Sequence, residues 1–318
     1  MYAGAVIKYA AQRIALSLVL LWVVVTFTFL LLQFVPGDPA AVILGGQGTP
    51  SQIAQLRGQL GLDRPVIAQY GTWLGNVLHA DLGRSVISGQ SVSSILNQRA
   101  PVTISLALAA TLVSVVVGVG MGILAAVRGG WVDRTVRFAA GLGAAVPNFW
   151  LGALLVLVFS VWLGILPSVG YTSLFRAPVS WARYMVLPIA AVAAASVAGV
   201  ARQTRASMSM ALQSDYVQTL RGAGLSRRSI VYKHALRNAS IPIVTVVGWL
   251  FVGLLGGAVL VEQVFALPSL GQATVQAIST NDIPVLQGLV IYTTVIVLIV
   301  NLLIDLAYAW LNPKVGHP

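Results

Sequence analysis

The stretch IALSLVLLWVVVTFTFLLLQFVPG, residues 14–37, contains no charged residue and is long enough to cross a membrane as an α-helix. A bilayer core of roughly 30 Å needs about 20 apolar helical residues, because each residue adds about 1.5 Å. Five further uncharged runs cover residues 100–127, 138–175, 184–201, 238–261 and 283–304. A charge at the bilayer centre costs at least about 2.5–3.5 kcal/mol, so these runs predict six transmembrane helices and an all-α membrane protein.

The composition agrees with this prediction. Hydrophobic residues make up 58% of the chain and charged residues 8%, against about 25% charged residues in soluble domains. The net charge of +11 would indicate a nucleic-acid partner in a soluble protein. In a membrane protein the positions of the charges matter more, and we expect membrane lipid and no nucleic acid around this chain. The absence of cysteine excludes disulfides and thiolate metal sites within the chain.

The basic residues predict the orientation of the spans. The first run is too long for a signal peptide, and Pro36-Gly37-Asp38-Pro39 follows it in place of a cleavage site, so we interpret it as a retained first helix. With the N-terminus inside, the inside segments hold thirteen Lys and Arg residues and the outside segments hold six. Four of those six lie in loop 38–99, where the charge rule is weak because long loops translocate regardless of charge. Both termini are therefore predicted to be cytoplasmic.

The outer loop 38–99 is predicted to contain short helices. Thr49-Pro50-Ser51-Gln52 is typical of a capping box with proline at the first helical position, and Gly61 ends that helix. A second amphipathic helix is predicted to begin near Pro65. This subdomain either covers the membrane helices or docks a partner, and the sequence does not decide between the two roles.

Small residues and one proline stand out within the spans. Gly118 and Gly122 have GxxxG spacing, which favours close helix packing within the chain or between subunits. Pro147 interrupts the third run and predicts a kink.

The centres of the predicted spans offer no charge that could pair with a ligand. We therefore expect a translocation pathway lined by small, apolar and weakly polar groups. The candidates are Asn148 and Phe149 beside Pro147, and Thr245 and Trp249 one helical turn apart in the fifth span. For the two aromatic rings, ordinary helix packing is an equally supported interpretation.

The sequence lacks the residue patterns that the enzymatic interpretations require. The three histidines lie outside the predicted spans, there is no HExxH motif, and no lysine follows a glycine, so a P-loop is absent. A secondary carrier usually has ionisable groups near the bilayer midplane, whereas Glu262 and Asp305 lie at the ends of runs. If transport is driven by ATP, the ATPase is therefore another polypeptide.

The inner loop 211–242 contains DYVQTLRGAGLSRR at residues 215–228. Ser226 is predicted to cap a helix that begins at Arg227, and Gly222 and Gly224 allow a sharp turn before it. A basic loop that merely obeys the positive-inside rule is the alternative interpretation.

The segment DYVQTLRGAGLSRRSIVYKHALRNASIPIV, residues 215–244, resembles the coupling loop of ABC importer permeases, more narrowly those of the dipeptide and oligopeptide type. Importers of this type have two paired permeases, and four other stretches resemble the first of them, the one with the long outer loop. These stretches are LLQFVPGDPA, LGLDRPVIAQYGTWLGNVLHADLGRSV, AVPNFWLG and AWLNPKV. The general importer motif starts Glu-Ala-Ala and ends Leu-Pro, whereas this chain has Gln218-Thr219-Leu220, and Arg237 follows Leu236. Gly222 and Ala223 also replace an expected alanine and basic residue. The peptide branch commonly departs from the general motif, so the coupling assignment stands.

The resemblance implies a type I ABC importer permease fold with six transmembrane helices in the bacterial plasma (inner) membrane. It divides the chain into residues 1–37 with the first helix, an extracytoplasmic helical subdomain at 38–99, and a five-helix core at 100–318 with coupling loop 211–238. The implied ATPase-coupling residues are Thr219, Leu220, Arg221, Gly222, Ala223, Gly224, Leu225, Ser226, Arg227 and Arg228.

The implied function is that of a permease subunit, forming half of the pathway of an ATP-driven peptide importer. Its partners are a homologous second permease, two P-loop ATPase subunits and an extracytoplasmic peptide-binding protein. No cofactor is expected in this chain, and ATP and Mg²⁺ belong to the ATPase subunits. A permease of the same family for nickel chelates, glutathione or haem remains open, as does a stand-alone secondary carrier.

Overall fold

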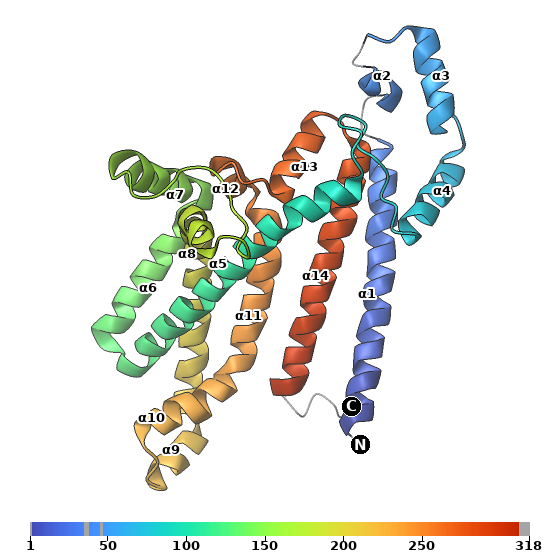
Figure 1. The fold of residues 1–318 in the computed structure, drawn as a ribbon. Helices are drawn as coiled ribbons and strands as arrows, with labels where there is room; N and C mark the ends of the chain where they lie inside the picture. The colour runs from blue at the N-terminus through green and yellow to red at the C-terminus, as the bar shows by residue number, and fades with distance from the viewer. Residues whose placement is uncertain (1, 35–37, 45–46, 312–318) are drawn as a thin grey trace. The chain divides into compact units, whose positions relative to one another are not determined.

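The computed structural model describes residues 2–34, 38–44 and 47–311, and the described residues form helices joined by loops (Figure 1). In chain order the helices are α1 (Tyr2–Leu32), α2 (Pro39–Ile43), α3 (Pro50–Leu60), α4 (Val66–Leu78), α5 (Val92–Arg128), α6 (Gly130–Ala145), α7 (Asn148–Leu155), η1 (Val156–Trp162), α8 (Pro178–Gln213), α9 (Asp215–Gly222), α10 (Arg227–Ser229), η2 (Ile230–Ala235), α11 (Leu236–Gly257), α12 (Val259–Val264), α13 (Leu270–Ser279) and α14 (Ile283–Leu311). The elements η1 and η2 are π-helices. Of the quoted motifs, Pro36, Gly37 and the tail from residue 312 onward lie outside the described residues.

The helices confirm the prediction of an all-α membrane protein. Among the residues that the structure describes, five helical segments are long and apolar enough to cross a membrane: Ala11–Leu32, Val92–Arg128, Pro178–Gln213, Arg227–Gly257 and Ile283–Leu306. The pair Gly130–Ala145 and Asn148–Trp162 is apolar enough to form a sixth span, although it bends by 95°.

The kink predicted at Pro147 is confirmed and is sharp enough to separate two helices. Val146 is extended, with φ −87° and ψ 124°, because the proline ring disfavours a helical conformation in the residue before it. Pro147 then caps the N-terminus of α7. The helical part of the predicted third run ends at Trp162, and residues 163–175 are irregular.

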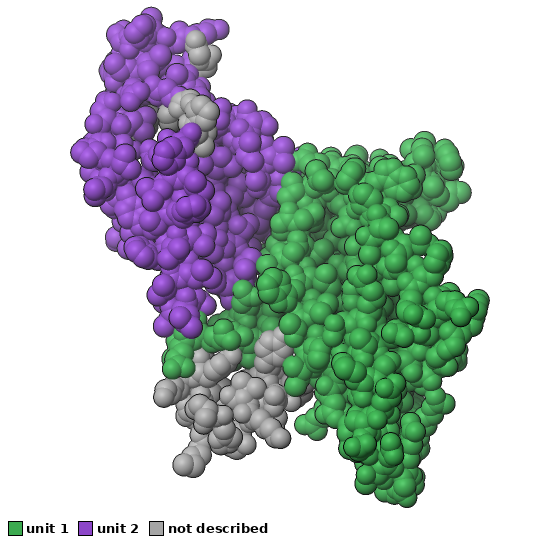
Figure 2. All heavy atoms as spheres, turned by 180° about the vertical axis from the view of Figure 1, so that it is seen from behind, with its two compact units in different colours: residues 1–14, 102–267, 299–318 green, residues 15–101, 268–298 purple. Residues whose placement is uncertain are grey.

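The chain divides into two compact units, which Figure 2 shows in different colours. Unit 1 comprises residues 1–14, 102–267 and 299–318, and unit 2 comprises residues 15–101 and 268–298. The domain boundaries expected from the sequence remain a prediction.

The central helix of unit 1 is α8, which packs against α6, α7 and α11. A Cβ atom added at Gly118 of α5 would lie 2.7 Å from Val200 Cβ, and one added at Gly122 would lie 2.5 Å from Thr204 Cβ. These distances are too short for any side chain, so both positions of the predicted GxxxG motif let α5 approach α8 closely. The predicted close packing is therefore confirmed, and it occurs within the chain.

An ion-pair cluster also joins α6 to α8. Both carboxylate oxygens of Asp133 accept hydrogen bonds from Arg205 on α8, and Arg137 lies 3.2 Å from the same carboxylate. Two-point binding between a guanidinium and a carboxylate fixes orientation as well as distance. Asp133 therefore fixes the beginning of α6 on α8.

The helices predicted in loop 38–99 are confirmed within unit 2. Thr49 caps α3 through a capping box, in which Thr49 N donates to Gln52 Oε1 at 2.9 Å. Gly61 ends α3 in the left-handed conformation, with φ +67°. Helix α4 contacts α1, where the ring of Tyr70 lies 5.3 Å from that of Phe29. The second predicted helix therefore packs on the first span.

Candidate functional site

The segment between α8 and α11 forms a helical hairpin at one end of these two helices (Figure 1). Its first arm, α9, begins with Asp215, whose charge is favourable at a helix N-terminus. Val217 is completely buried and anchors this arm. The main chain then turns sharply, with Gly224 N bonded to Arg221 O at 3.0 Å and Leu225 N bonded to Leu220 O at 3.2 Å.

Only one of the two glycines supplies the conformation that the turn requires. Gly224 has φ +79°, a region that most side chains avoid, and no atom lies within 4 Å of the position that its Cβ would take. Backbone conformation, rather than space, therefore decides which residue can replace Gly224. Gly222 belongs to the end of α9.

The second arm begins as predicted from the sequence. Ser226 caps α10, and its Oγ accepts a hydrogen bond from Ser229 N at 3.3 Å. The π-helix η2 follows at once and buries Ile230, Val231 and Ala235. The hairpin therefore has an apolar inner side that is fixed to unit 1.

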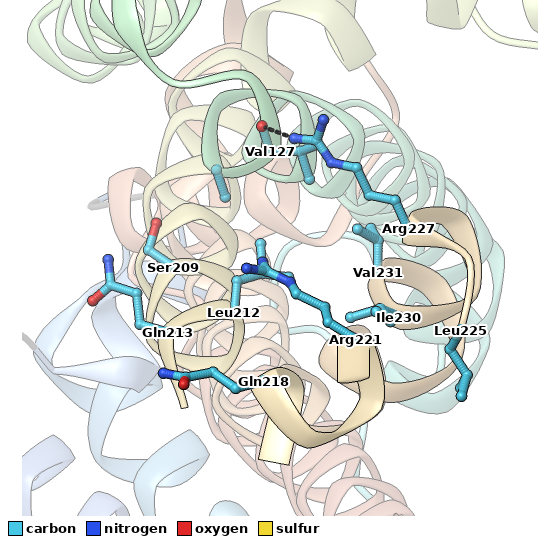
Figure 3. Close-up of a pocket in the computed structure, with 11 residues that line it drawn as sticks. Val127, Ser209, Leu212, Gln213, Gln218, Arg221, Leu225, Arg227, Ile230 and Val231 are labelled. Carbon is cyan, nitrogen blue, oxygen red and sulfur yellow. Dashed lines mark hydrogen bonds between the residues drawn. The ribbon is translucent and has the colours of Figure 1, made fainter. Parts of the chain in front are cut away.

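A hollow of about 1030 Å³ lies between this hairpin and the ends of α5 and α8 (Figure 3). Arg227 spans part of it and donates from Nη2 to Val127 O at 2.7 Å. This carbonyl belongs to the last turn of α5, where main-chain acceptors lack partners within the helix. Figure 3 shows Arg221 reaching from α9 toward Leu212. Arg221 makes no ion pair or hydrogen bond through its side chain with any described residue.

The structure brings the ten predicted coupling residues together on one surface. Leu220 and Leu225 are half-buried, while the other eight residues are exposed. The contribution of Val127 leaves no signal in the sequence, because its part in the site is a main-chain carbonyl that any residue could supply. A coupling role for this surface remains a prediction at this point.

The predicted pathway residues lie on two helices that each pack against α8. Asn148 and Phe149 begin α7, and the Phe149 side chain is 42% exposed. On α11, Thr245 Oγ1 donates to Ile241 O at 3.0 Å, while Trp249 is 77% exposed. Both rings therefore face the surroundings of this chain, and their role in a pathway stays a prediction.

The chain is similar to known transport proteins along nearly its whole length. Residues 118–317 match the family described as "Binding-protein-dependent transport system inner membrane component", and residues 6–107 match the corresponding N-terminal family. The chain therefore belongs to the family of binding-protein-dependent transport system inner membrane components. It is a multi-pass inner membrane protein and the permease subunit of an ABC importer, and it is not itself an ATPase. Such a system also requires a binding protein and an ATPase.

Two relatives and one solved structure place the chain more closely. A protein of Brucella abortus (strain 2308), whose name describes a peptide transport system permease, is 42% identical over 307 residues, covering 96% of this chain and 98% of its own. The glutathione transport system permease protein GsiC of Escherichia coli (strain K12) is 38% identical over 312 residues, covering 98% and 99%. An inward-facing structure of the MetNI methionine ABC transporter matches with a TM-score of 0.55 at 16% identity, over 69% of this chain and 97% of that chain. The first two similarities confirm the resemblance found in the sequence, and the third supports the fold alone.

Proposed function

We propose that this chain forms one half of the translocation pathway of an ATP-driven importer of short peptides, and that residues 219–228 dock on a separate ATPase subunit. The observation that carries the docking role is the exposed turn at Gly224, which has a guanidinium on either side and buried anchors behind it. An exposed basic surface that is rigidly attached to membrane helices is suited to receive a force from a protein partner.

The proposed orientation places both termini and the hairpin in the cytoplasm, and residues 38–99 outside. The supporting observation is the distribution of the nineteen Lys and Arg residues, thirteen of which fall in the inside segments. The remaining partners are a homologous second permease, a second ATPase subunit and an external peptide-binding protein. ATP and Mg²⁺ bind to the ATPase subunits.

The proposed cargo follows from the names of two relatives, one of a peptide system and one of a glutathione system. Glutathione is itself a tripeptide. Both names therefore favour a short peptide as the cargo.

In the proposed mechanism, ATP binding closes the ATPase pair and moves residues 219–228. Because Val217, Ile230 and Val231 are buried on the inner side of the hairpin, this movement passes to α8 and α11 rather than bending a free loop. The pathway then changes from inward-open to outward-open, and hydrolysis resets it. This is a two-state element that a ligand biases from one end.

The variant Gly224→Val tests the docking role. A β-branched residue at φ +79° costs about 1–3 kcal/mol of backbone strain, so the turn changes shape while the membrane helices are untouched. Binding-protein-stimulated ATPase activity should fall at least fivefold with normal membrane insertion.

The matched control is Gly224→Asn, because asparagine tolerates left-handed backbone conformations. It should retain most of the stimulated activity. Normal stimulation in the valine variant would show that the hairpin is only a basic connector.

A further inference from the structure

A second hollow, of about 350 Å³, lies within unit 2. It is formed by the loop before α5, the first turns of α5, and α13 with the connection to α14. Its polar lining includes Ser88, Gln90, Gln98, Arg99, Gln276 and Thr280. Its volume is at the lower end of the range for small-molecule pockets, about 300–1,000 Å³.

A buried carboxylate fixes the shape of this hollow. Asp282 is 4% exposed and accepts a hydrogen bond from Ser85 Oγ at 2.5 Å and one from Val86 N at 3.3 Å. Ser85 Oγ in turn accepts from Ser88 N at 2.9 Å. These bonds attach the loop before α5 to the start of α14 and so hold two walls of the hollow together.

The wall of the hollow carries a cation that has no anionic partner among the residues described. Arg99 donates from Nη1 to Gln272 Oε1 at 3.2 Å and from Nη2 to Gln276 Oε1 at 3.4 Å, and both acceptors are neutral amides. Asp282 lines the same hollow but forms no ion pair with Arg99. A guanidinium has five N–H donors, so several remain available.

We propose that this hollow binds the terminal carboxylate of a short peptide, with Arg99 as the anchoring residue. A guanidinium fork matches a carboxylate with two parallel hydrogen bonds. The amides of Gln90 and Gln98 can bond the peptide main chain, which both donates and accepts. The inference rests on the proposed function and orientation, which place Arg99 on the outer side, where a binding protein would release its cargo.

Such a subsite recognises a group that all linear peptides share. It places little demand on side chains, because apart from Arg99 and the hydrogen-bonded Asp282 the lining consists of amides, hydroxyls and small or aliphatic groups. The centres of the predicted spans hold no charged residue. Arg99 lies instead near the start of α5, so the two observations agree.

The test measures binding to the complete importer in lipid nanodiscs, without the binding protein. Equilibrium dialysis compares radiolabelled trialanine with trialanine amide, which lacks the carboxylate. The wild type should bind the acid at least tenfold more tightly than the amide. Arg99→Gln should weaken binding of the acid at least tenfold and change binding of the amide less than twofold.

Two further variants separate recognition from structure. Gln272→Glu is nearly isosteric and supplies Arg99 with an internal carboxylate, so it should also remove the preference for the acid. The control is Arg84→Gln. Arg84 belongs to the loop before α5, donates to Gly89 O and does not line the hollow, so the preference for the acid over the amide should persist in this variant.

Equal binding of acid and amide by the wild type would overturn the inference. Equal weakening of acid and amide binding by Arg99→Gln would also overturn it, because Arg99 would then only support its glutamine neighbours. A preference for the acid that appears only after the binding protein is added would overturn it as well. Uptake of trialanine by the same importer with its binding protein and ATP tests the proposed function separately. Uptake without acid-selective binding would reject the subsite alone, and absence of uptake would reject both.

Discussion

Residues 38–78 and residues 214–235 differ in how their arginines are paired. In the first, Arg57 lies 3.0 Å from Asp38 and 3.2 Å from Asp63, and its hydrogen bonds to Asp63 and Asp38 raise the pKa of its guanidinium. In the second, Arg221 and Arg228 make no ion pair with the residues that the structure describes. The first segment pairs Arg57 internally, whereas the second leaves Arg221 and Arg228 available to a partner.

The two segments also differ in how they are anchored. Helix α4 has no buried residue and contacts α1 through Tyr70 and Trp73. The hairpin 214–235 instead inserts Val217, Ile230 and Val231 into unit 1, where each is at most 4% exposed. A segment with exposed, unpaired arginines and buried anchors is suited to transmit force. A segment whose Arg57 is ion-paired and whose helix α4 makes only a lateral contact is less suited to this.

The largest effect is expected from reversing the free charges. The double variant Arg221→Glu, Arg228→Glu should lower the amount of ATPase that co-purifies with the permease at least tenfold, because it reverses the charge of the proposed docking surface. The same reversal at Arg57 should leave ATPase retention within twofold. Equal loss in both variants would break the comparison between the segments.

The next effect concerns the helices to which the hairpin is attached. Gly122→Val places side-chain atoms against Thr204 and the carbonyl of Ala201, so overpacking should cost about 1–3 kcal/mol and lower the thermal unfolding midpoint in detergent. Gly120→Val, on an open face of the same helix, is the control and should unfold at nearly the wild-type temperature. A similar loss at both positions would show that α5 does not depend on this contact.

The smallest effect is expected in the first segment. Arg57→Gln removes two exposed ion pairs, which contribute little and are weakened by salt. Peptide uptake should stay within twofold of wild type, and any difference should shrink as ionic strength rises. A large, salt-independent loss of uptake would indicate that these ion pairs organise a docking surface after all.

Local rules in the sequence predicted much of this fold. The capping box at Thr49, the stop at Gly61 and the cap at Ser226 depend on residues within four positions of each other, and all three are confirmed. The 95° bend at Pro147 was predicted only as a kink, because proline fixes the break but neighbouring packing sets the angle. The end of the helix at Trp162 was missed because hydrophobicity continues beyond it, although Gly164 and Gly170, both with positive φ, are the signal.

The site depends more on distant contacts, which the sequence could not reveal. The ten coupling residues are consecutive in the chain, so the sequence alone predicts that they lie close together. The bond from Arg227 to Val127 O joins residues 100 positions apart, and the acceptor leaves no trace in the side-chain pattern. The glutamine partners of Arg99 lie more than 170 positions away, so nothing in its local sequence distinguishes that arginine.

The central claim, that residues 219–228 form the ATPase docking surface, can be tested by thiol labelling. The chain has no cysteine, so Arg228→Cys and Ile67→Cys each introduce its single thiol, and Ile67 is 86% exposed on α4. Labelling by a maleimide is measured in nanodiscs, which expose both faces, with and without bound ATPase subunits. Bound ATPase should slow labelling of Arg228→Cys at least tenfold and leave Ile67→Cys unchanged. An unchanged rate at position 228 would contradict the claim.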